Sequence, residues 1–168
     1  MFSRNGFLPI YDAARRIPRC VVQRLHSDGL QKNANRKSSS FHEDDDQDPR
    51  FAAYLDSYRG SGYDRGHMAA ARDHSHSKSA LTSTFQLDNI APQIGPAMNR
   101  GAWERLERYV RGLCLDYYDV TVVSGPLFLP RMDSEGRWTV LHEVIGGPLV
   151  GSAVPTHFFK AILARNPK

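Results

Sequence analysis

The strongest structural constraint in the sequence is the spacing of apolar residues between Asn99 and Leu113. Within this range the apolar side chains recur at intervals of three, four and seven: Ala102, Trp103, Leu106, Tyr109, Val110 and Leu113. Such recurrence places one apolar stripe along an α-helix, because about 3.6 residues make one turn. The sequence therefore predicts a long amphipathic helix whose apolar stripe packs against the rest of the chain.

Short β-branched or aromatic segments on both sides of this helix predict strands. We expect strands at Arg19–Leu25, Phe85–Ile90, Val120–Val123, Trp138–Ile145 and His157–Leu163. Pro92 is expected to close the second strand and Gly125-Pro126 the third, while Met68–Arg72 predicts a short helix. Strands on both sides of a long helix predict an α+β fold.

Composition and charge set broad limits on function. The 168 residues fit one domain, placed at residues 1–168, and a net charge of +4 suits a polyanionic partner. Cys20 and Cys114 fit no metal-binding spacing, so we expect two free thiols in a reducing compartment. No apolar run approaches the roughly 20 residues that span a bilayer. Met1–Cys20 lacks an apolar core and contains two prolines, so it carries no clear presequence.

The segment His26–Arg50 is polar and predicts a long surface loop. Its acidic run, Glu43–Asp48, has the alternating aspartates of a calcium loop. However, Pro49 stands where that loop needs glycine, and Leu55 stands where it needs a bidentate glutamate. We therefore predict a solvated acidic loop.

The run Asp64-Arg65-Gly66-His67, followed thirty-two residues later by Asn99, has the residue types that phosphodiester hydrolysis requires. A histidine can take a proton from water because its ordinary pKa of about 6.5 leaves it mostly neutral near pH 7. A side-chain amide oxygen is an acceptable ligand for Mg²⁺, and arginine binds phosphate through fixed, charged N–H groups. We therefore predict His67 as general base and Asn99 as metal ligand. Gly66 is expected to allow a sharp backbone turn.

Two charged residues further along the predicted helix extend this hypothesis. Glu107 lies about 80° around the helix from Asn99, so we expect it to reach a metal through a water molecule. Arg111 is four residues beyond Glu107 and is expected to pair with its carboxylate. Asp64 is expected to orient a neighbouring arginine or a metal-bound water.

Each of these residues also has an ordinary structural interpretation. His67 can be a surface residue of a glycine-containing loop, Asn99 a helix cap, and Glu107 with Arg111 a solvent-facing pair. The run Asp73-His74-Ser75-His76 holds two histidines without a third ligand, so a flexible polar loop is favoured over a metal site.

Several blocks in the same order resemble the DNA/RNA non-specific endonucleases that carry a ββα-metal motif, and within that family the mitochondrial endonuclease G branch. The matching blocks are Ser61–Ala69, Thr84–Gln93, Met98–Glu107, Ser124–Pro130 and Val154–Lys160. The resemblance runs from about Tyr11 to Leu163, and collinear blocks are far more specific than the four-residue signature alone.

The resemblance implies a central, mainly antiparallel sheet flanked by helices, and cleavage of DNA and RNA that depends on Mg²⁺ or Mn²⁺ and leaves 5′-phosphate ends. It would make His67 the general base and Asn99 the one direct metal ligand. Glu107 would hold a metal-bound water, and Arg65 and Arg111 would be the phosphate-site arginines. It further implies a homodimer and, in a eukaryote, a mitochondrial location.

Three other positions follow from the same resemblance. Asn89 matches an active-site amide with a supporting role, and Asp64 lies in the substrate-binding signature. His42 stands where relatives carry arginine or lysine, so a phosphate contact there would be pH-sensitive. The relatives continue past the position of Lys168 with further strands and a helix, so we expect the domain to be C-terminally incomplete.

The leading interpretation is a metal-dependent endonuclease with little sequence specificity. Phosphate contacts carry no base information, so low specificity is expected if they dominate binding. The principal alternative is a catalytically inactive, truncated nuclease homologue that binds nucleic acid or has a regulatory role. A phosphodiesterase acting on small substrates is a third alternative, which the arginines and the basic pI disfavour.

Overall fold

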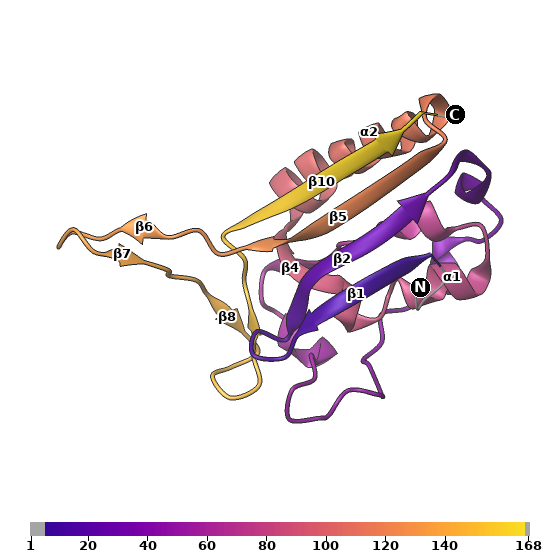
Figure 1. Cartoon of the computed structure of the whole chain (residues 1–168). Helices are drawn as coiled ribbons and strands as arrows, with labels where there is room; N and C mark the ends of the chain where they lie inside the picture. Colours follow the sequence, from indigo (N-terminus) through magenta and orange to yellow (C-terminus); the bar gives the residue numbers. More distant parts are fainter. Residues whose placement is uncertain (1–5, 167–168) are drawn as a thin grey trace.

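An antiparallel sheet of four strands, in the order β1-β2-β5-β10, forms the larger layer of the molecule (Figure 1). The structure is a computed structural model that describes residues 6–166. Its strands are β1 (Phe7–Asp12), β2 (Ile17–Leu25), β3 (Tyr63–His67), β4 (Ile90–Ile94), β5 (Asp119–Leu127), β6 (Arg131–Met132), β7 (Trp138–Thr139), β8 (Val144–Ile145), β9 (Ser152–Ala153) and β10 (His157–Arg165). The pairs β3-β4, β6-β7 and β8-β9 form separate two-stranded antiparallel sheets.

The helices lie mostly between β2 and β5 along the chain. The α-helices are α1 (Lys78–Ser83) and α2 (Glu104–Asp116), and η6 (Gly95–Trp103) is a π-helix that runs directly into α2. The 3₁₀ helices are η1 (Ser27–Leu30), η2 (Arg36–Ser38), η3 (Leu55–Tyr58), η4 (Ala71–His74) and η5 (Leu87–Asn89). The mixture of an antiparallel sheet with separate helices confirms the predicted α+β class.

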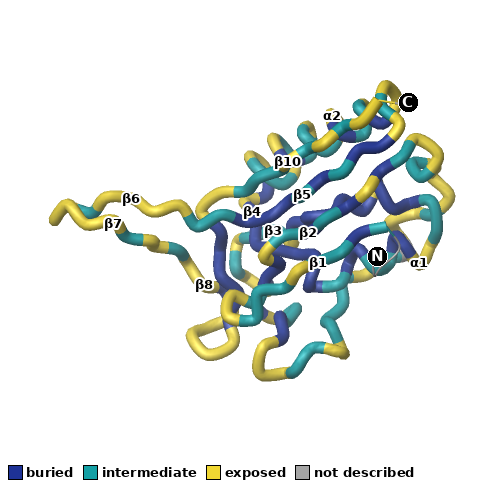
Figure 2. Tube along the Cα trace, viewed as in Figure 1, coloured by how far each residue is buried: buried dark blue, intermediate teal, exposed yellow. Residues whose placement is uncertain are grey.

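The β3-β4 hairpin and α2 pack on the same face of the main sheet. On β2, Val21 and Leu25 point to one face, because side chains four residues apart in a strand share a side. Val21 belongs to a buried cluster with Met68 and Ala91 of the hairpin region, whereas Leu25 packs with Val110 of α2. Figure 2 shows this interior as a buried layer behind the sheet. The β3-β4 hairpin and α2 therefore lie side by side on one face of the main sheet.

The long helix is confirmed, but its first part differs from the prediction. The helix begins at Gly95, and its first nine residues are π-helical, so Asn99 lies inside the element and is not its cap. A Cβ on Gly101 would lie 2.8 Å from the carbonyl oxygen of Pro96, so a glycine permits this close packing. Tyr109, which belongs to the predicted apolar stripe, is 60% exposed.

Two predicted strand ends were wrong for the same physical reason. β5 continues through Gly125-Pro126, and Pro126 pairs with Phe158 of β10 but lies beyond the part of β5 that pairs with β2. The strand predicted at Phe85–Ile90 is wrong except at Ile90: residues 87–89 form η5, and β4 begins at Ile90 and runs through Pro92, which pairs only with β3. A proline lacks the N–H for a second neighbour, so it is tolerated where a strand pairs on one side only.

Other elements agree in part. β2 and β10 contain the predicted strands at their positions, whereas only the two ends of Trp138–Ile145 are paired, as β7 and β8. The predicted helix at Met68–Arg72 is displaced to η4. The hairpin of β6 and β7 projects beyond the sheet and is largely exposed (Figures 1 and 2). The segment His26–Arg50 is a loop, as predicted, apart from two short 3₁₀ helices and an isolated bridge at His42, but it does not lie wholly on the surface, because Phe41 packs against buried clusters.

The structure also bears on the predictions for the two cysteines and for membrane spans. Cys20 and Cys114 are both free. Within the described residues, no helix combines the length and apolar character needed to cross a membrane.

Candidate active site

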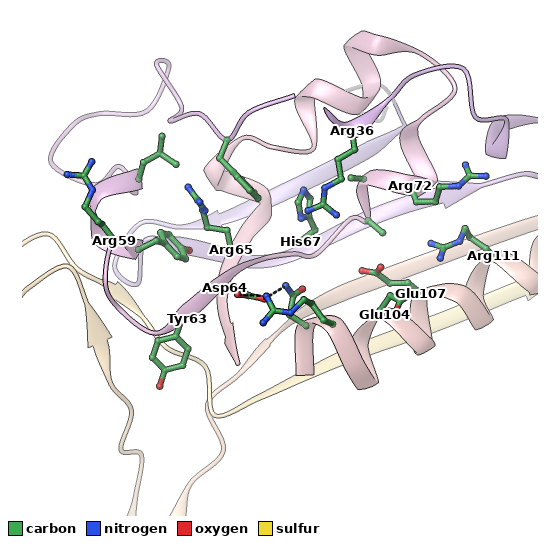
Figure 3. Close-up of a pocket in the computed structure, with 17 residues that line it drawn as sticks. Arg36, Arg59, Tyr63, Asp64, Arg65, His67, Arg72, Glu104, Glu107 and Arg111 are labelled. Carbon is green, nitrogen blue, oxygen red and sulfur yellow. Dashed lines mark hydrogen bonds and ion pairs between the residues drawn. The ribbon is translucent and has the colours of Figure 1, made fainter. Parts of the chain in front are cut away.

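A cleft of about 880 Å³ lies between the β3-β4 hairpin, the loop that precedes it, and the η6-α2 helix. Six residues predicted from the sequence line it together: Asp64, Arg65, His67, Asn99, Glu107 and Arg111. In Figure 3, His67, Arg65 and Arg36 lie along one side, and Glu104, Glu107 and Arg111 lie along the helix that faces them. Two segments distant in the sequence thus form the two walls of one cleft.

The pleat of β3 explains how the signature presents its side chains. Arg65 and His67 are two residues apart, so they point to the same face of the strand. Gly66 lies between them without a positive φ, so the expected sharp turn is wrong. A Cβ at Gly66 would instead lie 2.2 Å from Oε1 of the buried Gln93 on β4. The glycine is required for close packing within the hairpin.

His67 is enclosed by aromatic rings. Its ring centroid lies 5.4 Å from that of Phe41 and 4.9 Å from that of Phe85. Its Nε2 is buried and has no hydrogen-bond partner among the described residues. Burial, assisted by the positive charge of Arg36, lowers the pKa of His67 to about 3. The imidazole is therefore neutral at pH 7, and one ring nitrogen is uncommitted.

This neutral imidazole makes the free energy of unfolding depend on pH. The folded-state pKa is depressed, so the unfolded chain binds one more proton between about pH 6.5 and pH 3, and stability falls as the pH falls through that window. The contribution is at most about 1.4 kcal/mol per pH unit. We expect His67→Asn to lose this slope in urea unfolding measured with EDTA from about pH 7 to 4.5. Parallel pH dependences of the two proteins would contradict a buried neutral His67.

Asn99 is fixed by the first residue of the signature. Its Nδ2 donates to Oδ2 of Asp64 at 2.9 Å, and the same carboxylate pairs with Arg100 at 2.7 Å. The expectation that Asp64 orients a neighbouring arginine is therefore confirmed, with Arg100 as that arginine. The hydrogen bond uses the amide nitrogen of Asn99, so the lone pairs of its Oδ1 remain for another partner.

The donor set of the cleft fits a hard divalent cation held by few protein ligands. Oδ1 of Asn99 and the carboxylate of Glu107 are oxygen donors on one continuous helix, and both residues line the cleft. Mg²⁺ prefers oxygen and commonly keeps several waters, so it does not require a cage of side chains. No group of three or more His, Cys, Asp or Glu residues suited to a metal occurs within residues 6–166.

The predicted pair between Glu107 and Arg111 is wrong. Arg111 Nη1 bonds Oδ1 of Asp73 at 2.8 Å, and the Asp73 side chain is 1% exposed. Arg111 pairs with the buried carboxylate of Asp73 rather than with Glu107, because a buried charged pair is stronger than an i, i+4 pair on a helix surface. Burial raises the pKa of Glu107, while the nearby Lys160 and Arg111 charges oppose that rise. Glu107 is thus free to face the cleft.

The run that contains Asp73 is not the flexible loop expected from its composition. Asp73, His74 and Ser75 are buried, and Nε2 of His74 is 3.1 Å from Oε1 of Gln23. No metal cluster forms there within the described residues. The run is structural, and it supplies the partner of Arg111.

We expect Asp73→Ala to lower the free energy of unfolding by about 3 kcal/mol, because it leaves the largely buried guanidinium of Arg111 without its counter-ion. Asp73→Asn keeps an acceptor oxygen and should cost less than half as much. Urea unfolding of the two variants measures the difference. Equal stability of Asp73→Ala and the parent chain would show that the pair contributes nothing to folding.

Two further predicted residues lie outside the cleft lining, as far as the described chain shows. Asn89 is fully buried, and its side chain bonds the backbone of Ala69 and Thr84, in keeping with a supporting role. His42 pairs through its backbone with Gln86, and its Nδ1 is buried without a hydrogen-bond partner in residues 6–166. The structure does not bring His42 to the other predicted residues.

Several cleft residues were missed. They are the arginines and aromatic residues at Arg36, Phe41, Tyr58, Arg59 and Arg72. Arg36 lies in the loop that was predicted to be solvent-exposed, and no local pattern marks it as part of a site. The order of charged residues in the sequence does not show which of them lies close to His67 once the loop is folded.

Comparisons with known proteins identify the family. Residues 2–168 match the family described as DNA/RNA non-specific endonuclease. The chain is 46% identical over 161 residues to "Endonuclease G, mitochondrial" of Bos taurus, covering 96% of this chain and 53% of the relative. It is 42% identical over 161 residues to "Nuclease 1, mitochondrial" of Schizosaccharomyces pombe, covering 95% and 50%. The chain thus spans about half the length of the curated relatives it matches.

A solved structure shares the fold. The crystal structure described as "EndoG/EndoGI complex: Mechanism of EndoG inhibition" superposes with a TM-score of 0.92 at 41% identity, covering 96% of this chain and 66% of the other. With the α+β architecture and a family match over nearly all of its length, this chain belongs to the DNA/RNA non-specific endonuclease family.

Proposed function

We propose that this chain is a metal-dependent endonuclease that hydrolyses phosphodiester bonds of DNA and RNA with little sequence specificity. The observation that carries the proposal is that His67 and Asn99, from two distant segments, line one cleft together with several arginines. Family membership supports the nucleic-acid substrate.

In this proposal His67 takes the proton of the attacking water. Its neutral imidazole and unpartnered Nε2 suit a proton acceptor. Burial alone would make it a weak base, but a bound phosphate is anionic and favours the protonated ring. Substrate binding therefore raises the pKa of His67 towards the operating pH, where general-base catalysis is most effective.

Asn99 would hold Mg²⁺ or Mn²⁺ directly, and Glu107 would act through a water molecule. When bound, the cation supplies Lewis-acid stabilisation of negative charge on the phosphate and the leaving oxygen. Asp64 keeps the amide of Asn99 oriented through the 2.9 Å hydrogen bond. This assignment makes the Asp64–Asn99 pair the point where the signature strand meets the helix.

The arginines of the cleft would bind the substrate backbone. Arg65, which lies 4.5 Å from the centre of the Phe41 ring, and Arg111, held by Asp73, would contact phosphate oxygens. Phosphate contacts fix a nucleic acid in place without reading its bases, which accounts for low specificity. Departure of the 3′-oxygen would leave 5′-phosphate ends.

Assembly and location extend the proposal. We infer a homodimer, and a mitochondrial location if the source is a eukaryote. The location is supported by relatives that are named mitochondrial nucleases.

The test uses supercoiled plasmid and single-stranded RNA, each with Mg²⁺ or with EDTA. We expect cleavage of both polymers with Mg²⁺ and none with EDTA. Binding of both without cleavage would instead identify an inactive homologue with a binding or regulatory role. Hydrolysis of bis(p-nitrophenyl) phosphate with both polymers left intact would identify a phosphodiesterase of small substrates.

A further inference from the structure

The backbone that follows the candidate general base is held by three different side chains. In the segment His67–Ala69, Trp103 Nε1 donates to the first carbonyl at 2.9 Å, and Lys160 Nζ donates to the second at 3.2 Å. Asn89 Nδ2 donates to the third at 3.0 Å, and its Oδ1 accepts from the amide of the same residue at 2.9 Å. Three separate elements thus fix the segment: η6, β10 and η5.

Lys160 connects this segment to the main sheet. Its Nζ also donates to Oγ of Ser124 at 2.7 Å, and these two residues are paired across β10 and β5. The same ammonium lies 4.1 Å from the centre of the Trp103 ring, which favours a cation. One charged group therefore contacts the sheet, the helix and the backbone next to His67.

The Lys160 ammonium is energetically unfavourable as a purely structural contact. Removing the ammonium from water costs desolvation free energy, and an apolar side chain of similar size does not incur this cost. Its charge is offset by the carboxylates of Glu107 on α2 and Asp73 on η4, while Arg111 opposes it. Lys160 does not line the cleft within the described residues, so it acts from behind the wall.

We propose that Lys160 is a positioning residue for the general base: by holding the carbonyl of Met68 against Ser124 and Trp103, it sets the position of the His67 ring. The inference rests on the proposed nuclease function. A positioning residue of this kind acts on the chemical step more than on binding, because it holds the backbone next to the base and does not touch the substrate.

The kinetic test replaces Lys160 with methionine, which keeps the length of the side chain and removes the charge. We expect kcat for an oligonucleotide duplex to fall at least about 10-fold, with KM within about threefold of the parent chain. The matched control is Lys78→Met, at an exposed lysine of α1 that is outside the cleft. Ser124→Ala keeps the lysine but removes one of its anchors, so a smaller fall in kcat is expected.

Chemical rescue separates positioning from folding. Lys160→Ala removes three methylene groups and the ammonium, which propylammonium replaces. We expect propylammonium to restore kcat in a concentration-dependent manner, and 1-propanol, which lacks the charge, not to do so. Unchanged kcat in Lys160→Met, or a loss that lies entirely in KM, would overturn the proposal.

Hydrogen exchange in EDTA tests the same contact without catalysis. The amide of Met68 donates to the carbonyl of Asn89 at 2.9 Å, so the segment 67–69 is protected in the folded chain. We expect peptides that cover this segment to exchange faster in Lys160→Met and to be unchanged in Lys78→Met. Faster exchange throughout β5 and β10 would mark Lys160 as a structural residue and overturn the proposal. If the parent chain cleaves no nucleic acid, the proposed function fails, whereas exchange still reports on the contact.

Discussion

Replacing His67 with alanine is expected to lower the rate of plasmid nicking by about 10²- to 10⁴-fold, the usual contribution of a general base. The variant removes the neutral ring whose Nε2 has no hydrogen-bond partner in the described chain. It leaves the arginines of the cleft in place, so the affinity for duplex DNA measured in EDTA should change by less than about threefold. Nicking is followed as the conversion of supercoiled to open-circular plasmid at a fixed Mg²⁺ concentration.

The matched control is His157→Ala. This histidine is exposed at the start of β10 and outside the cleft, so its loss should leave nicking unchanged. Nicking that survives in His67→Ala would remove His67 from the mechanism. A loss of nicking accompanied by an equal loss of binding would assign the residue to substrate binding instead.

The second large effect is expected for Asn99→Ala. Removing the one side-chain oxygen assigned to the metal should lower activity by at least about 100-fold and shift the Mg²⁺ titration to higher concentration. The substitution also removes the donor to Asp64, whose carboxylate keeps its pair with Arg100. Calorimetric titration of Mn²⁺ measures the loss of affinity without any substrate.

Asn33→Ala serves as the control, because Asn33 is an exposed asparagine whose side-chain amide donates to the backbone carbonyl of His76. It should leave both the activity and the metal titration unchanged. An unchanged Mg²⁺ dependence in Asn99→Ala would exclude Asn99 as the ligand.

The sequence predicted the parts of the fold that depend on local pattern. The long helix follows from apolar spacing, and β2 and β10 follow from β-branched and aromatic runs. β1 was missed because Pro9 interrupts its pattern, yet Pro9 is accommodated in a strand that pairs only with β2. The extensions of β4 and β5 through Pro92 and Pro126 depend on which neighbours a strand has, and that information is not local.

Six residues of the candidate site were predictable from the sequence, whereas its other members and most of its contacts were not. His67 and Asn99 were identified by residue type and order, and both line the cleft. The partner of Arg111 is Asp73, thirty-eight residues away in the chain, and no helical spacing points to it. Lys160 was present in a matching block, but its role depends on the sheet that carries it to the base.

The number of residues in the π-helical stretch Gly95–Trp103 helps to determine the geometry of this cleft. Removing one residue between Asn99 and Glu104 would leave Val110 and Cys114 of α2 packed on the sheet while rotating the side chain of Asn99 about the helix axis. A change of side chain in this stretch alters one contact, whereas a change in its residue count moves Oδ1 of Asn99, the proposed metal ligand, relative to the imidazole of His67. The number of residues between the β3-β4 hairpin and α2 thus sets the position of Asn99. A single-residue deletion there should lower nuclease activity far more than most substitutions.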